Sequence, residues 1–335
     1  MLSRRWREAR TRSASASCVS GAAARSSRTR RQCCTSSFRS RAATQSAALL
    51  AHHWEGAREP YTAARWHERA ADWVAARDRS ELVKHWQRVR DLLASEPETQ
   101  ESLALRVRAC RHLLDSISLG SSEDFSALFC EGMALAERLH DPAPRVRLLN
   151  VYANSLVFAG RLEDAEQRFR ESLHLADASG NPFLRFLARV PLTRAFIIAG
   201  RPAEALAASE EAEEFGRGRP ELESEPGLSP LGLLLVQQGR ALTYLGRPVE
   251  GARVIDRAIA LARTRREREL TAFAELCRVM PCGVLGEPEA ELAHAQRALE
   301  AAESSANTYL RAMSLSALGQ AHVAGGRWQD ALDAL

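Results

Sequence analysis

Apolar and polar positions along most of the chain follow the period of an α-helix. From Val254 to Ala262, apolar residues recur three and four positions apart, a spacing that places them on one face of a helix. Similar amphipathic stretches alternate from Ala47 to the end of the chain, for example Leu234–Leu245 and Leu315–Ala324. The pattern predicts an all-α fold.

A short motif divides these predicted helices into copies. Its glycines stand at positions 120, 160, 200, 246, 286 and 326, in steps of 40, 40, 46, 40 and 40 residues. A fixed period of this length indicates a repeat protein. The single long step contains the stretch from Arg217 to Ser229, whose Gly, Pro and Glu residues indicate a loop insertion.

Each part of the motif has a mechanical role. The glycine ends one helix, because a left-handed residue is tolerated best without a Cβ. Pro202, Pro248 and Pro288 follow two residues after a glycine, where proline suits the first turn of the next helix. Small residues such as Ala165 and Ala205, five positions after the glycine, let two helices approach closely.

Two helices per copy cannot bury their apolar faces alone, whereas stacked copies can. We therefore expect residues 45–335 to form a right-handed superhelical solenoid of antiparallel helix pairs, with a period of about 40 residues. The helices should break at or beside the six glycines of the motif.

Residues 1–44 have a different composition. They contain eleven arginines, many serines and alanines, and a single acid, Glu8, with no apolar periodicity. Such a segment is expected to be disordered. Arginine- and serine-rich, acid-poor sequence is typical of a mitochondrial presequence. It is also typical of out-of-frame translation of GC-rich DNA, an interpretation favoured by the presence of one lysine against forty-five arginines in the whole chain.

Charge and hydropathy narrow the range of partners. The overall charge is +4, but residues 1–44 contribute +10, so the predicted array carries −6. A mildly acidic array argues against a nucleic-acid partner. The best apolar run, Leu231–Val236, is far too short to cross a bilayer. We expect a cytoplasmic protein with no membrane partner, in which the scattered cysteines remain thiols.

Most catalytic motifs are excluded. The only lysine, Lys84, lies between Val83 and His85, so there is no phosphate-binding loop. Leu148, Leu149, Tyr152, Leu156 and Phe158 have helical spacing and indicate core rather than a cofactor box. We therefore expect no enzyme activity and no cofactor.

Histidines and tryptophans gather in one segment: His52, His53, His67 and His85 with Trp54, Trp66, Trp73 and Trp86. A metal site or an aromatic ligand box is one interpretation. No carboxylate or cysteine stands at ligand spacing, which favours tryptophans in the helix interfaces and histidines at their rim. No metal is expected.

The repeated positions resemble the tetratricopeptide pattern of large and small residues. In one copy they are Leu235, Gln238, Gly239, Leu242, Gly246, Gly251, Ile255 and Ala258. The sequence segments from Ala48 to Glu55 and from Ala63 to Ala71 are similar to segments in the C-terminal helical arrays of large bacterial signalling ATPases. That group includes proteins fused to adenylate or guanylate cyclase domains and the maltose-regulator-type transcription factors. The resemblance covers roughly residues 45–335.

This resemblance implies a regulatory arm that recognises other proteins, or its own catalytic domains, by shape. It also implies that the chain is a fragment, without an upstream nucleotide-binding domain and ending inside a helix. One alternative is a fragment of an enzyme, a cyclase or an ATPase, with catalytic domains in the missing upstream segment. Another is a free-standing organellar repeat protein.

A candidate binding surface follows from the register of the copies. Counting back six residues from the glycines at 160, 200, 246 and 326 gives Asn154, Arg194, Arg240 and Gln320. On the tetratricopeptide resemblance these side chains point into a concave groove and form a ladder suited to carboxylates or a peptide backbone. Met280 interrupts the ladder in the remaining copy. The alternative is a solvated helix face.

Overall fold

A computed structural model of the chain describes residues 46–75, 78–117, 125–219, 222, 229–305 and 307–334. These residues form fifteen α-helices and no strand. The helices are α3 (Ala47–Gly56), α4 (Pro60–Val74), α5 (Arg79–Leu93), α6 (Gln100–Ile117), α7 (Phe125–Ala136), α8 (Ala143–Phe158), α9 (Leu162–Ala178), α10 (Pro182–Ile198), α11 (Pro202–Gly216), α12 (Pro230–Tyr244), α13 (Pro248–Arg265), α14 (Arg268–Leu285), α15 (Pro288–Ser305), α16 (Thr308–Ala324) and α17 (Trp328–Ala334). The predicted tail, residues 1–44, and Gly120 lie outside the described residues.

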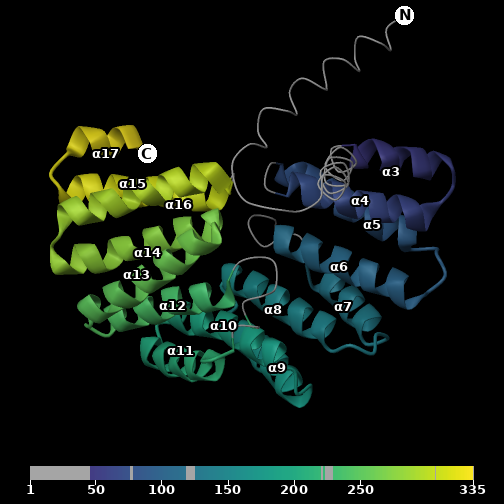
Figure 1. Ribbon diagram of the computed structural model, residues 1–335, viewed down its shortest axis with the longest axis horizontal. Coiled ribbons are helices and arrows are strands. Elements are labelled where there is room, and N and C mark those ends of the chain that lie inside the picture. Colours follow the sequence, from purple (N-terminus) through teal and green to yellow (C-terminus); the bar gives the residue numbers. More distant parts are fainter. Residues whose placement is uncertain are drawn as a thin grey trace, which may run out of the picture. The chain divides into compact units, whose positions relative to one another are not determined.

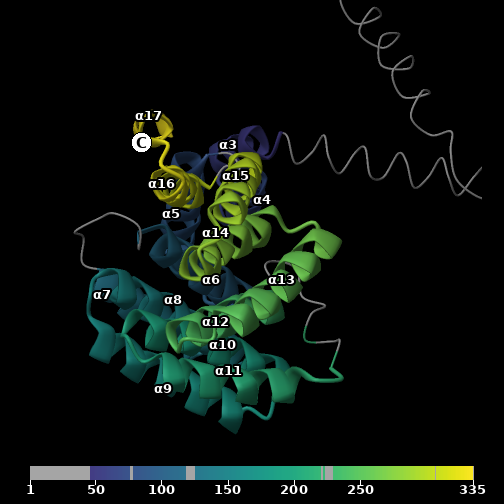
Figure 2. The same ribbon diagram turned by 90° about the vertical axis from the view of Figure 1, so that its left-hand side faces the viewer.

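Helix pairs stack in two layers. The first helices of successive pairs, α6, α8, α10, α12, α14 and α16, contact one another in order. Each second helix packs mainly on its own partner and on the first helix of the next copy. Figures 1 and 2 show α9 and α11 on the outer side of α8, α10 and α12. The predicted all-α stack of helix pairs is confirmed.

Glycines make the turns inside the pairs. Gly160, Gly200, Gly246, Gly286 and Gly326 have φ values between +70° and +78°. After each glycine, the next backbone N–H donates to a carbonyl five residues earlier, as from Arg161 to Leu156 at 2.9 Å. This is the Schellman arrangement, which satisfies carbonyls at the end of a helix. The breaks predicted at these five positions are confirmed.

The residues after the glycine start the second helix. Pro202, Pro248 and Pro288 are the first residues of α11, α13 and α15, as predicted. The arginine after the glycine also has a role that the sequence did not suggest. Arg247 Nε donates to Glu250 Oε1 at 2.7 Å, and the equivalent pairs recur after Gly160 and Gly200. Water screens such exposed ion pairs, so each contributes little to stability.

Small residues permit close contact within each pair. Ala165 and Ala205 are fully buried. In the copy made by α12 and α13, glycine replaces alanine, and a Cβ on Gly251 would clash with the carbonyl oxygen of Gly239. The largest core cluster draws its buried residues from α6 to α12, including Phe169 and Leu149.

The tryptophan-rich segment is only partly core. Trp86 is buried at 2% exposure and stacks on His112 with ring centroids 4.4 Å apart. Trp54, by contrast, is 38% exposed. None of the described helices is both long and apolar enough to span a membrane.

Enlarging the small residues should destabilise the array. Leucine at Ala165 or Ala205 would overpack the contact within the pair and should lower the free energy of unfolding by about 1–3 kcal/mol. Because copies stabilise their neighbours, the loss should extend to adjacent copies. Urea denaturation measures it, and Ala207→Leu at an exposed position of α11 is the control. Native stability of both Ala165→Leu and Ala205→Leu would contradict the packing described here.

Candidate partner-binding groove

The first helices line a groove with a volume of ≈ 540 Å³. Side chains from α8, α10, α12, α14 and α16 form most of it, and Glu291 of α15 joins them at one wall. We call this surface the inner groove. It is defined by apolar Phe158, Ile198, Tyr244, Phe273, Met280 and Met313 and by polar Arg194, Arg240, Gln320 and Glu291.

The structure brings the predicted ladder together. Arg194, Arg240 and Gln320 all line the inner groove, and Met280 occupies the interrupted position between them. Asn154 is not among the residues that line the groove, but its Oδ1 accepts a hydrogen bond from Arg194 Nη2 at 2.6 Å. Equal distances from the turn glycines place these residues at matching heights, because the first helices lie side by side. Their role in binding stays a prediction.

A second row of residues on this face, apolar and exposed, was not predicted from the sequence. Phe158, Ile198, Tyr244 and Val284 stand two residues before the turn glycines, and their side chains are 44%, 45%, 54% and 60% exposed. They follow the ladder by four residues, so they share its face of each helix. The assignment of Phe158 to the core is wrong. Its spacing along the helix is the same as that of the core residues. Only its position two residues before Gly160 distinguishes it from them, because the other members of this exposed row stand at the same distance from their own turn glycines.

The array curves enough to bring distant copies into contact. The rings of Phe158, at the end of α8, and Tyr309, at the start of α16, meet edge to face with centroids 6.1 Å apart. The guanidinium carbon of Arg194 lies 5.4 Å from the centroid of Phe158. Copies four apart in the chain therefore share one end of the inner groove.

The two arginines of the groove lie near each other. Burial lowers the pKa of Arg194 and the positive charge of Arg240 lowers it further, whereas Tyr309 and the acid Asp115 of α6 raise it. Arg240 Nη1 donates to the neutral Gln237 at 2.9 Å. Within the described ranges, neither arginine forms a salt bridge. Burial alone raises the pKa of Glu291, with no contribution from either guanidinium.

This arrangement is suited to binding an anion that carries apolar groups. Two guanidiniums supply donors for it, and aromatic and aliphatic side chains supply the walls. The one thiol in the lining, Cys277, has its pKa raised by burial to about 11. It is therefore almost entirely protonated at neutral pH and is not an activated nucleophile.

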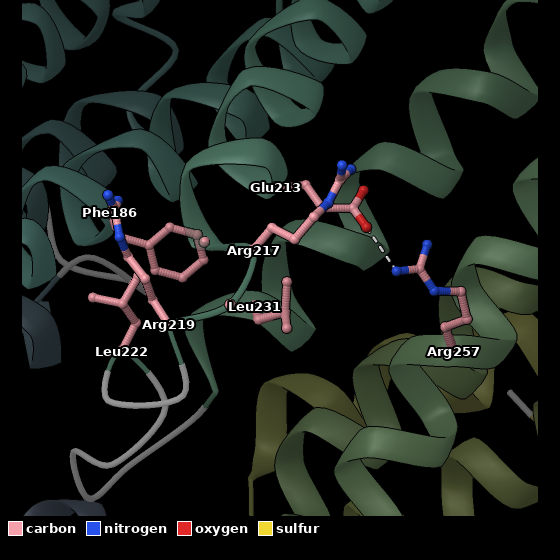
Figure 3. A pocket seen from close by; sticks show the side chains of 9 residues that line it. Phe186, Glu213, Arg217, Arg219, Leu222, Leu231 and Arg257 are labelled. Carbon is pink, nitrogen blue, oxygen red and sulfur yellow. Dashed lines mark hydrogen bonds and ion pairs between the residues drawn. The ribbon is translucent and has the colours of Figure 1, made fainter.

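A second cavity, of ≈ 420 Å³, lies beside the turn after α11. Phe186, Leu222 and Leu231 line it, and the Glu213–Arg257 ion pair at 2.6 Å crosses from α11 to α13 (Figure 3). The neighbouring residues 220, 221 and 223–228 lie outside the described part of the chain. We therefore assign no function to this cavity.

The histidines near the N-terminal helices pack against one another. His67 Nδ1 lies 2.9 Å from His85 Nδ1, and His67 Nε2 lies 2.6 Å from Glu55 Oε1. Burial lowers the pKa of both histidines. His67 is buried rather than at the rim. The described residues contain no cluster of three or more His, Cys, Asp or Glu side chains that could hold a metal ion.

No protein-family model matches the chain, and no curated protein matches it. Solved structures do. A Rap protein complexed with competence and sporulation factor has 12% identity and a TM-score of 0.58, and the match covers 87% of this chain and 74% of that one. The Rap conjugation gene regulator of plasmid pLS20, in complex with the Phr* peptide, has 16% identity and a TM-score of 0.52, covering 84% and 78%.

A signal transduction ATPase with a tetratricopeptide repeat sensor, from Pyrococcus horikoshii, has 16% identity and a TM-score of 0.49, covering 81% of this chain and 45% of that one. This likeness is too slight to place the chain among such ATPases. At these identities the likeness concerns the fold alone. The chain is a tetratricopeptide-like helical array.

Acid should destabilise the array through His112. Burial lowers the pKa of this histidine to about 3, and Arg111 and Arg108 add to the effect. Arg111 Nη2 lies 2.8 Å from His112 Nε2, a contact that needs an unprotonated ring nitrogen. Because the folded pKa lies below the ordinary 6.5, the unfolded chain binds the proton more readily. This contribution to stability is full above pH 6.5 and decreases as the pH falls toward 3.

Replacing His112 by phenylalanine tests this. The substitution keeps a ring against Trp86 and removes the titration, so its Tm should fall less than the native Tm between pH 6.5 and 4. His140→Phe, at an exposed position, should show the native slope. Parallel Tm profiles for His112→Phe and the native chain would contradict the assignment.

Proposed function

We propose that this array is a protein-interaction scaffold that captures its partner in the inner groove. The observation that carries the proposal is the pairing, on one surface, of an exposed apolar row with two arginines that form no salt bridge with a described residue. Aromatic residues and arginine are the side chains most enriched at the energetic centres of protein interfaces. A tetratricopeptide-like fold supports the same class of function.

The apolar row supplies the driving force. Full burial of a large apolar side chain is worth about 1.5–3 kcal/mol. Phe158, Ile198 and Tyr244 are each about half exposed, so a partner that covers them gains roughly half of that from each. The arginines then select among apolar partners by charge. Two proteins of similar fold were solved with a competence and sporulation factor and with a Phr* peptide, which supports a peptide-like partner here.

The wider role that we propose is regulatory and non-enzymatic. The array is the cytoplasmic arm of a signalling ATPase or nucleotide cyclase, and its partner is another protein or the catalytic domains of the same protein. The sequence segment around His52 and Trp54 supports this role, because it resembles the helical arrays of signalling ATPases and cyclases. Sequencing the gene upstream of codon 45 tests it. An in-frame nucleotide-binding or cyclase domain is expected, and the lack of one there contradicts this role.

Removing both groove arginines should weaken partner capture. Affinity purification from the source cells compares the native chain with Arg194→Ala plus Arg240→Ala. The double variant should retain less of the partner, while its Tm stays close to native because neither guanidinium forms a salt bridge with a described residue.

Arg65→Ala plus Arg253→Ala is the matched control, because it removes two arginines at exposed positions outside the groove. This variant should capture partners as the native chain does. Equal capture by the groove variant and the native chain would mean that the ladder is only a solvated face.

A further inference from the structure

We infer that the inner groove receives a short acidic segment of a partner protein, with an Asp or Glu carboxylate held between Arg194 and Arg240 and apolar residues on both sides of it. This inference rests on the proposed function and adds the chemistry of the ligand. Three features of the groove support it: two arginines without a salt bridge to a described residue, hydrogen-bond donors that remain available, and the apolar walls of the same cavity.

The guanidinium of Arg194 is partly buried between Asn154 and the ring of Phe158. The cation Arg240 lowers its pKa and the acid Asp115 raises it, but among the described residues neither arginine has an acid in salt-bridge contact. Both side chains remain charged at neutral pH, because an arginine is effectively never deprotonated in a protein. A carboxylate placed between them would relieve their repulsion and replace the lost hydration of Arg194.

Glu291 does not serve as this carboxylate. It lines the groove from α15, but burial alone accounts for the raised pKa of its carboxyl group, and no guanidinium acts to lower it. A carboxylate paired with Arg194 or Arg240 would show the opposite effect. Within the described residues, the groove therefore carries two cations that its own acid does not neutralise.

Hydrogen-bond donors are also available. A guanidinium has five N–H donors. Within the described part of the chain, Arg194 gives one hydrogen bond to Asn154 and Arg240 gives one to Gln237. The remaining donors suit a carboxylate, which arginine binds in two parallel bonds. The amide of Gln320, exposed on α16, can serve the backbone of the same segment.

The apolar walls belong to the same cavity as this charged pair. Ile198 and Tyr244 follow the arginines by one helical turn on α10 and α12. Phe273 and Met313 enter the same cavity from α14 and α16. A small anion would leave these side chains in water, whereas a segment with apolar residues around its acid covers them.

The size of the groove sets the length of the ligand. Its ≈ 540 Å³ falls within the range of pockets that enclose a drug-sized molecule. Such a volume accommodates a few residues of an extended segment and excludes a folded domain. Tyr309 meets Phe158 at one end, so the segment contacts both distant copies that form this end.

Selection from a random heptapeptide library displayed on phage tests the inference with the full chain. We expect the selected peptides to be enriched in Asp or Glu next to aromatic or aliphatic residues. A synthetic copy of one selected peptide, and a version with its acid changed to the amide, are then titrated by fluorescence anisotropy. The amide version should bind the native chain about tenfold more weakly, the value of one lost charge-assisted hydrogen-bonded pair.

Arg194→Gln plus Arg240→Gln completes a double-mutant cycle. This variant should bind the acidic and amide peptides equally, at the weaker of the two native affinities. Arg65→Gln plus Arg253→Gln is the matched control and should keep the tenfold preference. All variants retain residues 1–44, so any attraction of acidic peptides to those eleven arginines is the same in each, and the difference in preference between variants reports the groove alone.

Tyr244→Ala plus Met313→Ala separates the inference from the proposed function. Suppose that these substitutions abolish peptide binding, yet acids are not enriched and the arginine variant binds as the native chain does. The inference on the ligand is then overturned and the groove remains the binding site. If no peptide is selected, or if binding is the same in every variant, the proposed function is overturned and the inference with it.

Discussion

The close approach of two helices beside each turn glycine is the constraint on which the rest of this structure depends. Ala165 and Ala205 are fully buried at that contact, and Gly251 meets the backbone at Gly239 so closely that no Cβ fits. The left-handed glycine before each contact reverses the chain. Because turn and contact recur at a fixed separation, every pair has a similar geometry, and the first helices of successive pairs lie side by side.

This regularity places matching positions on one surface. Residues six before the turn glycine form the ladder, and residues two before it form the apolar row. Neither is required to hold the pair together, since the core lies between the layers around residues such as Phe169. The inner surface can therefore carry exposed aromatics and arginines without salt bridges to described residues, which a core could not tolerate. Large exposed apolar patches commonly mark interaction sites.

Curvature turns this surface into a groove. Each copy is rotated slightly relative to the previous one, and in a solenoid these rotations accumulate. After four copies the ring of Tyr309 reaches Phe158. The contact involves two partly exposed aromatic side chains, so the local energetic contribution is small. Its consequence is geometric, because two distant copies line one end of the same cavity.

The sequence by itself determined the local structure. Glycine with positive φ at Gly160 and Gly246, and proline at the start of the next helix at Pro202 and Pro248, act through backbone sterics and were predictable. The spacing also indicated that Arg194 and Arg240 occupy equivalent positions of successive first helices.

The tertiary structure alone decided what depends on neighbours distant in the chain. The exposure of Phe158, the meeting of His67 with His85 and the contact with Tyr309 were not predictable. A core helix and an exposed helix end have the same apolar period. The curvature of the stack is a sum of small rotations set by side-chain packing between copies, and no local pattern of residues encodes that sum.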